Sequence, residues 1–270
     1  MNFSVHFNIY SLQFMCGRIF CLFENSHDLL EAVQCACEPA NLTVTADDYL
    51  NYKGPNYNVC PTQRIPVLNA ESQLVLLPWG FHIGSLFVVN ARSDEIYEKR
   101  TFKDIVDHER CVVISSGYYE WRESKSTSKK EAFSFKPKDQ KVCLMAALRH
   151  PSSGSVVLVT REATMKLSSI HTRMPVILRP ESLKEWLDPT LSFRSLSKTL
   201  IDDENYSGYR KGFKKPLEIE ATALAPHVNS IKNTGPECLQ SLKAFKEESF
   251  NKGIGRFFSK KRKETEKEGE

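Results

Sequence analysis

Residues 111–122 read CVVISSGYYEWR, an apolar run that carries a carboxylate, Glu120, close to its end. β-Branched and aromatic residues fill most of the run, which is typical of strands rather than helices. A buried carboxylate needs hydrogen-bond or charge partners, or it stays protonated, because desolvating a lone charge is costly. The run therefore predicts a core strand with a polar group in it. A functional role and a salt bridge to an arginine both remain open for Glu120.

Outward from this run, short strand-like segments with turn-rich joints dominate the sequence. The expected strands are 19–23, 65–68, 74–79, 111–122, 132–135, 142–148, 156–160 and 217–224. Helical patterns are fewer, and the expected helices are 27–37, 102–108, 163–169, 180–186 and 195–202. The expected fold class is α+β, with a twisted antiparallel or barrel-like sheet as the core and helices at its periphery.

The amino-acid composition limits the classes of protein to which this chain can belong. A chain of 270 residues with 41% hydrophobic and 26% charged side chains has globular proportions. Every long apolar stretch is interrupted before the roughly 18 residues that a membrane-spanning helix needs, so we expect no membrane partner. The net charge of +4 is too small to identify a nucleic-acid binder. We expect one folded domain at 16–245, acting as a monomer, and a disordered charged tail at 246–270.

The cysteines indicate a reducing, intracellular environment, because they are scattered and several stand in apolar, strand-like runs. They are Cys16, Cys21, Cys35, Cys37, Cys60, Cys111, Cys143 and Cys238. Only one residue separates Cys35 from Cys37, and no second Cys/His pair at finger-like spacing completes a tetrahedral site. We therefore expect no metal and no cofactor.

Five short segments place polar groups in apolar surroundings, where packing alone does not explain them. They are Met15-Cys16-Gly17-Arg18, Trp79-Gly80, Asn90-Ala91-Arg92-Ser93-Asp94, Gly117-Tyr118-Tyr119-Glu120-Trp121 and Ile170-His171-Thr172-Arg173-Met174-Pro175. For His171, as for Glu120, a structural ion pair is the competing interpretation. Arg92 and Asp94 are two residues apart and therefore on one strand face, so a simple pair between them is the competing role for Arg92.

These segments, in this order, resemble the SRAP family of SOS-response-associated peptidase-like proteins, over residues 16–239. The resemblance also includes Tyr57–Thr62, Glu185–Asp188, Val228-Asn229 and Pro236–Leu239. It implies a β-rich α+β domain with a positively charged groove for single-stranded DNA. Residues 80–84, GFHIG, depart from the usual Gly-Leu-hydrophobic-Pro pattern, so contacts to DNA near that edge are less defined than the cysteine chemistry.

The resemblance also implies roles for individual residues. The nucleophile is Cys16, Glu120 is the acid/base group, His171 is its companion, and Asn90 hydrogen-bonds near the cysteine amine. The expected DNA contacts are phosphate binding by Arg18, Arg92 and Arg173 and base stacking by Trp79 and Trp121. Trp121 is equally compatible with a core position, since it follows Glu120 directly.

An amino-terminal cysteine suits the capture of abasic sites in single-stranded DNA. The open form of an abasic sugar is an aldehyde, and an amine and a thiol on adjacent carbons close a thiazolidine ring with it. An α-amino group titrates near pH 8, against about 10.4 for lysine, so far more of it is nucleophilic at neutral pH. Residues 1–14 would block this amine. We therefore expect Met15 to be the initiator and 1–15 to be a non-native extension, or else cleavage after Met15.

Two other functions compete with this sensor of DNA damage at replication forks. One is a thiol hydrolase or peptidase, with its own chain among its substrates, that uses Cys16, His171 and Glu120 and needs only the thiol. The other is a non-catalytic reader of modified bases, which would tolerate Cys16→Ala. The lyase-like crosslinking reaction differs from both because it needs the free amine as well as the thiol.

The tail contains a motif that resembles a box for binding the PCNA sliding clamp. Ile254, Phe257 and Phe258 have the required spacing of one aliphatic residue and two aromatic residues, although Asn251 stands where glutamine is usual. Lys260-Lys261-Arg262-Lys263 is typical of a nuclear-import patch and also of an ordinary solvated tail. The expected location is the nucleus.

Overall fold

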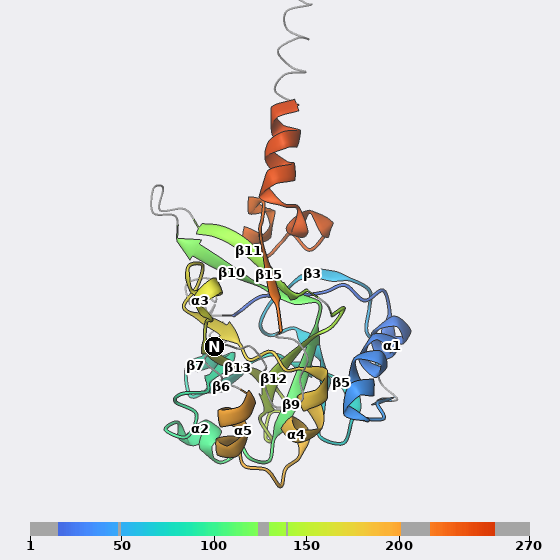
Figure 1. Ribbon diagram of the computed structural model, residues 1–270, viewed down its shortest axis with the longest axis vertical. Helices are drawn as coiled ribbons and strands as arrows, with labels where there is room; N and C mark the ends of the chain where they lie inside the picture. The colour runs from blue at the N-terminus through green and yellow to red at the C-terminus, as the bar shows by residue number, and fades with distance from the viewer. Residues whose placement is uncertain (1–15, 48–49, 124–129, 139, 201–216, 252–270) are drawn as a thin grey trace, which may run out of the picture.

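The computed structural model describes residues 16–47, 50–123, 130–138, 140–200 and 217–251 (Figure 1). Within these residues the strands form two large sheets and one separate hairpin. The five-stranded sheet has the order β15 (Ile219–Ala223), β11 (Lys130–Pro137), β10 (Gly117–Glu123), β1 (Ile19–Cys21) and β3 (Asn56–Val59). All of its pairs are antiparallel.

The second sheet has eight strands and contains most of the core. Its order is β14 (Arg173–Pro175), β13 (Val156–Glu162), β12 (Cys143–Arg149), β9 (Arg110–Ser115), β4 (Arg64–Leu68), β5 (Gln73–Pro78) and β2 (Thr45–Ala46), and β8 (Asn90–Arg92) pairs in parallel with β13. The hairpin consists of β6 (Phe81–Ile83) and β7 (Leu86–Val88). The α+β class is confirmed, and the described strands form open sheets rather than a closed barrel.

The run 111–122, expected as one strand, is two strands in different sheets. β9 pairs with β12 and β4, which explains why all six of its residues are buried. The chain then turns at Ser116, whose N–H donates to the carbonyl of Phe20, and continues as β10 beside β1. Gly117 starts β10 at a point where a Cβ atom would collide with the carbonyl oxygen of Phe135 and the ring of Phe20. A glycine is therefore needed where the run passes between the sheets.

The helices are short and peripheral, as expected, but several differ in length from the sequence prediction. α1 (Ser26–Cys37) starts one residue earlier than predicted, because the Asn25 side chain accepts hydrogen bonds from the first turn. α2 (Arg100–Lys103) and α3 (Met165–Ser168) are single turns. α4 (Leu183–Leu187) and α5 (Phe193–Leu200) lie together at the lower end of the view in Figure 1. The 3-10 turns are η2 (Glu38–Ala40), η3 (Pro180–Ser182), η4 (Pro226–Asn229) and η5 (Pro236–Leu239).

A buried arginine at the start of β9 holds the α4 and α5 region against the sheet. The Arg110 guanidinium donates hydrogen bonds to five main-chain carbonyls and lies near the ring of Trp186. The accepting carbonyls belong to Val106, Asp107, Trp186, Asp188 and Leu191. Because these carbonyls face inward, a charged side chain can be buried here with its donors satisfied.

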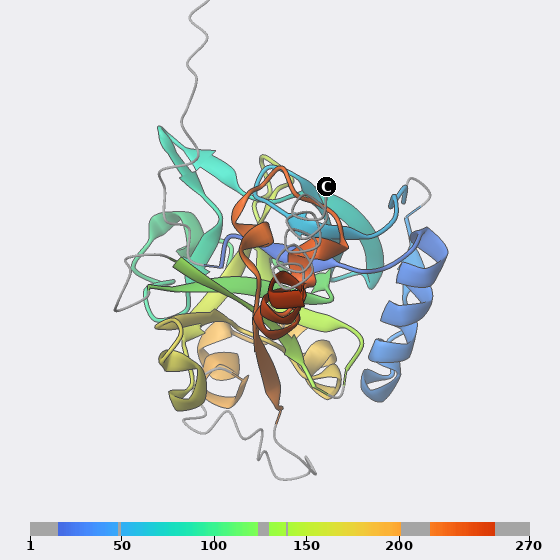
Figure 2. The same cartoon turned by 90° about the horizontal axis from the view of Figure 1, so that it is seen from above.

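The carboxyl-terminal part covers the five-stranded sheet and then leaves the domain. Phe20, Tyr119, Ala132, Leu224, Val228 and Cys238 form a second, smaller buried cluster. Residues 242–251 form a helix that extends away from the body of the molecule, at the top of Figure 1 and toward the viewer in Figure 2. The tail boundary expected at residue 246 falls inside this helix. Among the described residues, none of the helices has the length and apolar character needed to span a membrane.

Candidate functional site

Cys16, Glu120 and His171 come together at the edge where β1 meets β10. Ile19 pairs with Tyr118 in these antiparallel strands, which places Cys16 beside Glu120. The backbone nitrogen of Cys16 donates to Glu120 Oε1 at 2.5 Å, and His171 Nδ1 lies 3.8 Å from the same oxygen. Cys16 and His171, which are far apart in sequence, thus both contact the carboxylate of Glu120. The structure therefore brings the three principal sequence-predicted residues into one cluster.

Cys16 is fully buried, and both of its functional groups face Glu120. Burial, followed by the charge of Glu120 and a hydrogen bond to it, raises the pKa of the Cys16 thiol well above its usual value, and the nearby charge of Arg173 opposes this only in part. The backbone φ of Cys16 is 49°, in the left-handed region that residues other than glycine seldom adopt. The thiol is therefore held neutral on a strained backbone.

Glu120 is a carboxylate in an apolar strand, only 4% exposed. Burial raises its pKa, and this outweighs the opposing effects of His171, of the Cys16 thiol and of the backbone N–H groups of Cys16 and Trp121. A carboxyl group with a raised pKa exchanges protons more readily near neutral pH than an ordinary one. Glu120 thus has the environment of an acid/base residue, with Cys16 and His171 as its partners in place of the arginine that the sequence left open.

The orientation of the His171 ring is set by the backbone of Arg173. Nδ1 lies 3.1 Å from the Arg173 N–H nitrogen and 3.0 Å from the Arg173 carbonyl oxygen. When the N–H donates to Nδ1, the proton of the neutral ring is on Nε2. The side chain is 25% exposed, so this imidazole connects the buried carboxylate to solvent.

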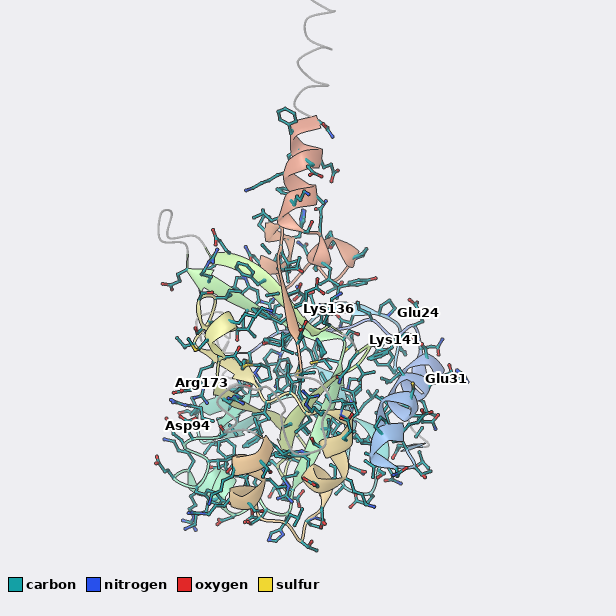
Figure 3. The ribbon with its side chains drawn as sticks, in the orientation of Figure 1. Glu24, Glu31, Asp94, Lys136, Lys141 and Arg173 are labelled. Atoms are coloured by element: carbon teal, nitrogen blue, oxygen red, sulfur yellow. The ribbon has the colours of Figure 1, made fainter. Side chains whose placement is uncertain are left out.

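The pairing of β13 with both β8 and β14 explains how a second group of charged residues assembles next to this cluster. Thr160 pairs with Arg92 on β8, and Glu162 pairs with Arg173 on β14. Asp94, two residues beyond Arg92, contacts both arginines: Oδ2 lies 2.8 Å from Arg92 Nη2, and Oδ1 lies 2.7 Å from Arg173 Nη2. Figure 3 shows Asp94 and Arg173 as neighbours. The competing role for Arg92, pairing with Asp94, is thus present in the structure.

Asn90 is the first residue of β8, opposite Leu158 and two residues before Arg92. Residues two apart in a strand point to the same face, so Asn90 lies on the face of Arg92. Asn90 is half-buried, and it lies on the same strand as Arg92, which contacts Asp94.

The two tryptophans expected to stack on bases lie in different surroundings. Trp79 is completely buried and its indole N–H donates to the carbonyl of Val89, so it is a core residue and cannot stack on a base. Trp121 is half-buried, and its N–H donates to Asn229 Oδ1 at 2.7 Å. The sequence did not reveal the burial of Trp79, because Gly80 after it is typical of an exposed turn.

Arg18 is oriented toward the carboxyl-terminal segment. Its Nη1 donates to Asn58 Oδ1 at 2.8 Å and to the carbonyl of Val228 at 3.0 Å. The guanidinium also lies over the ring of Trp121, 5.0 Å from its centre. These contacts link the start of β1 to η4 through Nη1 of Arg18, and the phosphate contact expected of Arg18 stays a prediction.

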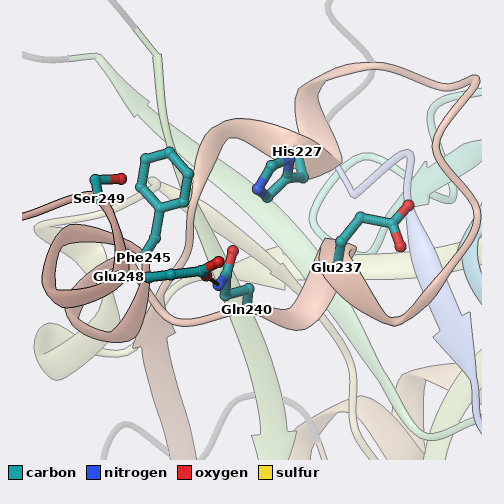
Figure 4. A pocket seen from close by; sticks show the side chains of 6 residues that line it. All are labelled: His227, Glu237, Gln240, Phe245, Glu248 and Ser249. Atoms are coloured by element: carbon teal, nitrogen blue, oxygen red, sulfur yellow. Dashed lines mark hydrogen bonds between the residues drawn. The ribbon is translucent and has the colours of Figure 1, made fainter. Parts of the chain in front are cut away.

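A cavity of about 450 Å³ lies apart from these residues, between η4, η5 and the helix 242–251 (Figure 4). None of the sequence-predicted site residues lines it. The lining residues are His227, Glu237, Gln240, Phe245, Glu248 and Ser249. The clamp-binding motif at Ile254, Phe257 and Phe258 and the basic run at 260–263 lie outside the described residues.

The fold and the Cys16–Glu120–His171 cluster define a protein of the SOS response associated peptidase class. Residues 15–229 match the model of the SOS response associated peptidase (SRAP) family. The chain therefore belongs to the SRAP family.

Relatives and solved structures agree with this assignment. The chain is 28% identical over 247 residues to the abasic site processing protein YoqW of Bacillus subtilis, covering 84% of this chain and 100% of the relative. It is 26% identical to HMCES, the abasic site processing protein of Pongo abelii, over 68% of this chain and 64% of the relative. A crystal structure from Bacteroides thetaiotaomicron superposes with a TM-score of 0.58 at 20% identity, covering 82% of this chain and 98% of that one, and shows the same fold.

Proposed function

We propose that this protein captures abasic sites in single-stranded DNA by forming a covalent thiazolidine with Cys16, after removal of Met15 has exposed the cysteine amine. The proposal rests on one observation: the buried carboxylate of Glu120 contacts both the nitrogen and the sulfur of Cys16. In the 270-residue chain that nitrogen is a peptide N–H, which stands in for the amine of the processed protein. Relatives with similar sequences are named abasic site processing proteins.

The proposed reaction forms two bonds to the aldehyde carbon of the sugar, one from nitrogen and one from sulfur. The Cys16 amine adds to the aldehyde carbon of the open sugar, and the resulting carbinolamine loses water to give an imine. The thiol sulfur then adds to the imine carbon, while its proton passes to the nitrogen. One water leaves in total, and no oxidation or reduction occurs. Glu120 lies within reach of both atoms and can protonate the departing hydroxyl and then accept the thiol proton.

The proposed roles of His171 and the arginines follow from their positions. The His171 ring lies beside Glu120 and is partly exposed, so it can protonate the sugar ring oxygen as the ring opens and return protons to solvent. Arg92 and Arg173, together with Arg18, are the guanidinium groups assigned to the phosphates beside the lesion. Asn90 is assigned to the amine of Cys16, as the family resemblance implies.

The thiol hydrolase is the weaker alternative. A cysteine nucleophile of that kind works as a thiolate, which requires a lowered pKa. Burial and Glu120 instead raise the pKa of the Cys16 thiol, and the close partner of His171 is Glu120. A neutral thiol suits the crosslinking reaction, in which the amine attacks first and the sulfur reacts only within the imine.

Removal of Met15 also relieves strain. A left-handed φ in a residue with a Cβ atom costs on the order of 1–2 kcal/mol, and the φ of Cys16 is 49°. This angle exists only while a peptide bond joins Cys16 to Met15. Cleavage there, or initiation at Met15 followed by methionine removal, would abolish the strain and free the amine in one event.

Two finer features belong to the same proposal: action in the nucleus at replication forks, and binding of a sliding clamp. Both rest on the tail, where Ile254, Phe257 and Phe258 have the spacing of a clamp-binding box and residues 260–263 form a basic run.

The decisive experiment compares protein beginning at Cys16 with the 270-residue chain. Each is incubated with single-stranded DNA containing one abasic site, and complexes that survive denaturation are counted on a gel. The protein beginning at Cys16 should form the complex, and its Cys16→Ser variant should not. Cys35→Ser, which removes an exposed thiol, is the matched control and should react normally. Efficient crosslinking by a chain that retains Met15 would show that the proposed bond is wrong.

A further inference from the structure

Asp94 accepts hydrogen bonds from Arg92 and Arg173, the guanidinium groups that would otherwise be available to a DNA phosphate. Its two oxygens contact Arg92 Nη2 and Arg173 Nη2, and Glu95 Oε1 lies 2.7 Å from Arg92 Nη1. Burial of the Asp94 carboxyl would raise its pKa, but hydrogen bonds from Arg173, from its own backbone N–H and from Arg92 hold this pKa below its usual value. Two arginines and two acidic residues thus neutralise each other in the unbound protein.

Arg173 is an unusual member of this group. Its side chain is only 5% exposed, yet Nε and Nη1 have no hydrogen-bond partner among the described residues. Nη2 alone carries the hydrogen bonds, to Asp94 Oδ1 at 2.7 Å, to the carbonyl oxygen of Thr160 at 3.0 Å and to the Thr160 hydroxyl oxygen at 3.4 Å. Buried donors without partners are uncommon in native proteins, and here they point to an anionic ligand for Arg173.

The shape of the guanidinium group shows why Asp94 matters to that ligand. A phosphate or carboxylate binds arginine most strongly through two parallel N–H bonds. The planar group offers two such pairs, Nε with Nη2 and Nη1 with Nη2, so Nη2 belongs to both. Since both hydrogens of Nη2 are directed to Asp94 and Thr160, neither pair is complete until one of these acceptors withdraws.

We infer that Asp94 is a specificity-determining residue that competes with DNA phosphate for Arg173 and so keeps the affinity for undamaged single strands low. This inference rests on the proposed function. Two residues accept from Nη2: Thr160, whose carbonyl is fixed within β13, and Asp94, which lies past the end of β8 and has a side chain that is 45% exposed. Asp94 is therefore the acceptor that a phosphate would displace. A damaged strand bonded covalently to Cys16 stays bound whether or not its phosphate displaces Asp94 from Arg173, whereas an undamaged strand must displace Asp94 to bind Arg173.

The test measures non-covalent binding of the 270-residue chain to a short, undamaged, fluorescent oligothymidylate. Asp94→Asn keeps the shape of the side chain but removes its charge, and we expect it to tighten binding about fivefold at low salt. The slope of log affinity against log salt should steepen by about 0.7, the value of one further phosphate contact on a single strand. Asp94→Glu retains the charge and should stay within about twofold of the unaltered protein.

A double-mutant cycle separates this mechanism from a simple change in net charge. In an Arg173→Lys background the positive charge remains but the paired donors are gone, so Asp94→Asn should give no further gain. Glu95→Gln removes one negative charge from the same group without touching Arg173, and should have a smaller effect than Asp94→Asn. A gain from Asp94→Asn that persists in the Arg173→Lys background, an equal gain from Glu95→Gln, or an unchanged affinity would each overturn the inference.

The outcome is independent of the crosslinking test. A protein that forms no covalent complex, but whose Asp94→Asn variant binds undamaged DNA more tightly, would refute the proposed function and leave the role of Asp94 intact. A protein that crosslinks normally, but whose affinity for undamaged DNA is unchanged by Asp94→Asn, would support the proposed function and refute the role of Asp94. Thermal unfolding of each variant confirms that altered affinity is not a loss of folded protein.

Discussion

Gly117→Ala tests whether the close packing at the start of β10 positions Glu120. A Cβ at this position would come closer than 3.0 Å to the Phe135 carbonyl oxygen and to the Phe20 ring. Carbon contacts are optimal at about 3.5–4.0 Å, so each neighbour must move by roughly 0.5 Å or more. The Phe135 carbonyl belongs to β11, which pairs with β10, and the Phe20 ring packs 5.0 Å from that of Tyr119. Neither neighbour is free to move.

Overpacking of this kind typically costs about 1–3 kcal/mol, and we expect the upper half of that range because a backbone atom is involved. For a domain of this size, a loss of about 2–3 kcal/mol lowers the melting temperature by roughly 5–10 °C. Glu120 stands three residues along the same strand. A displacement approaching 1 Å there should slow crosslinking by on the order of 100-fold, well beyond any loss of folded protein at 25 °C.

The assays are thermal unfolding by circular dichroism and single-turnover crosslinking to a saturating abasic oligonucleotide. Gly154→Ala is the control, because its Cβ would meet nothing within 4 Å although its φ is 64°. That variant should lose about 1 kcal/mol from backbone strain and crosslink at the normal rate. If Gly117→Ala unfolds and reacts like the unaltered protein, the packing of β10 does not position Glu120.

Three further predictions follow from buried groups and from the tail. Glu120→Gln should slow crosslinking at least 100-fold yet stabilise the protein at neutral pH. Because burial raises the pKa of Glu120, the ionised carboxylate destabilises the folded protein increasingly as the pH rises above the usual pKa of a glutamate. In melting curves recorded at several pH values, the difference in stability between the variant and the unaltered protein should therefore shrink toward pH 4. Arg110→Met leaves five carbonyls without their donor and should cost about 3–5 kcal/mol in urea unfolding, whereas Arg149→Met, at an exposed pair with Glu109, should cost less than about 1 kcal/mol. Replacing Phe257 and Phe258 by alanine should abolish binding to a sliding clamp in a pull-down, and retained binding would discount the tail motif.

The sequence predicts much of the strand content from local signals, whereas Cys16 and His171 are singled out with Glu120 only through the family resemblance. Strand-forming residues bounded by turns identify most of the strands of both large sheets, and Glu120 is conspicuous as a carboxylate in an apolar run. Strands of two to four residues, such as β2, β8 and β14, carry too little pattern to be recognised. Their existence depends on partners elsewhere in the chain, as β8 depends on β13.

The surroundings of some residues are set by distant segments and cannot be predicted from the sequence. Base stacking by Trp79 is wrong because this side chain is enclosed in the core, and Arg18 has two protein partners, Asn58 and Val228, that the sequence does not indicate. No local pattern reveals such partners, since they lie 40 and 210 positions from Arg18 in the chain. The sequence indicates Asp94 as a partner of Arg92, but its second bond, to Arg173, depends on the pairing of β8 and β14 with the same strand, β13.

The burial of the cluster suits the order of the two bond-forming steps in the proposed reaction. A thiolate exposed to solvent would react early and reversibly with any aldehyde, whereas the amine must attack first if a ring is to close. Burial raises the pKa of the Cys16 thiol and of Glu120 together, so the sulfur stays protonated while the carboxyl group becomes a better proton donor at neutral pH. Once the imine forms, its carbon is held next to the sulfur, and Glu120 can take the thiol proton without moving. In the proposed reaction, one low-dielectric site would therefore suppress attack by the thiol as the first step and supply both the acid and the base for attack by the amine followed by ring closure.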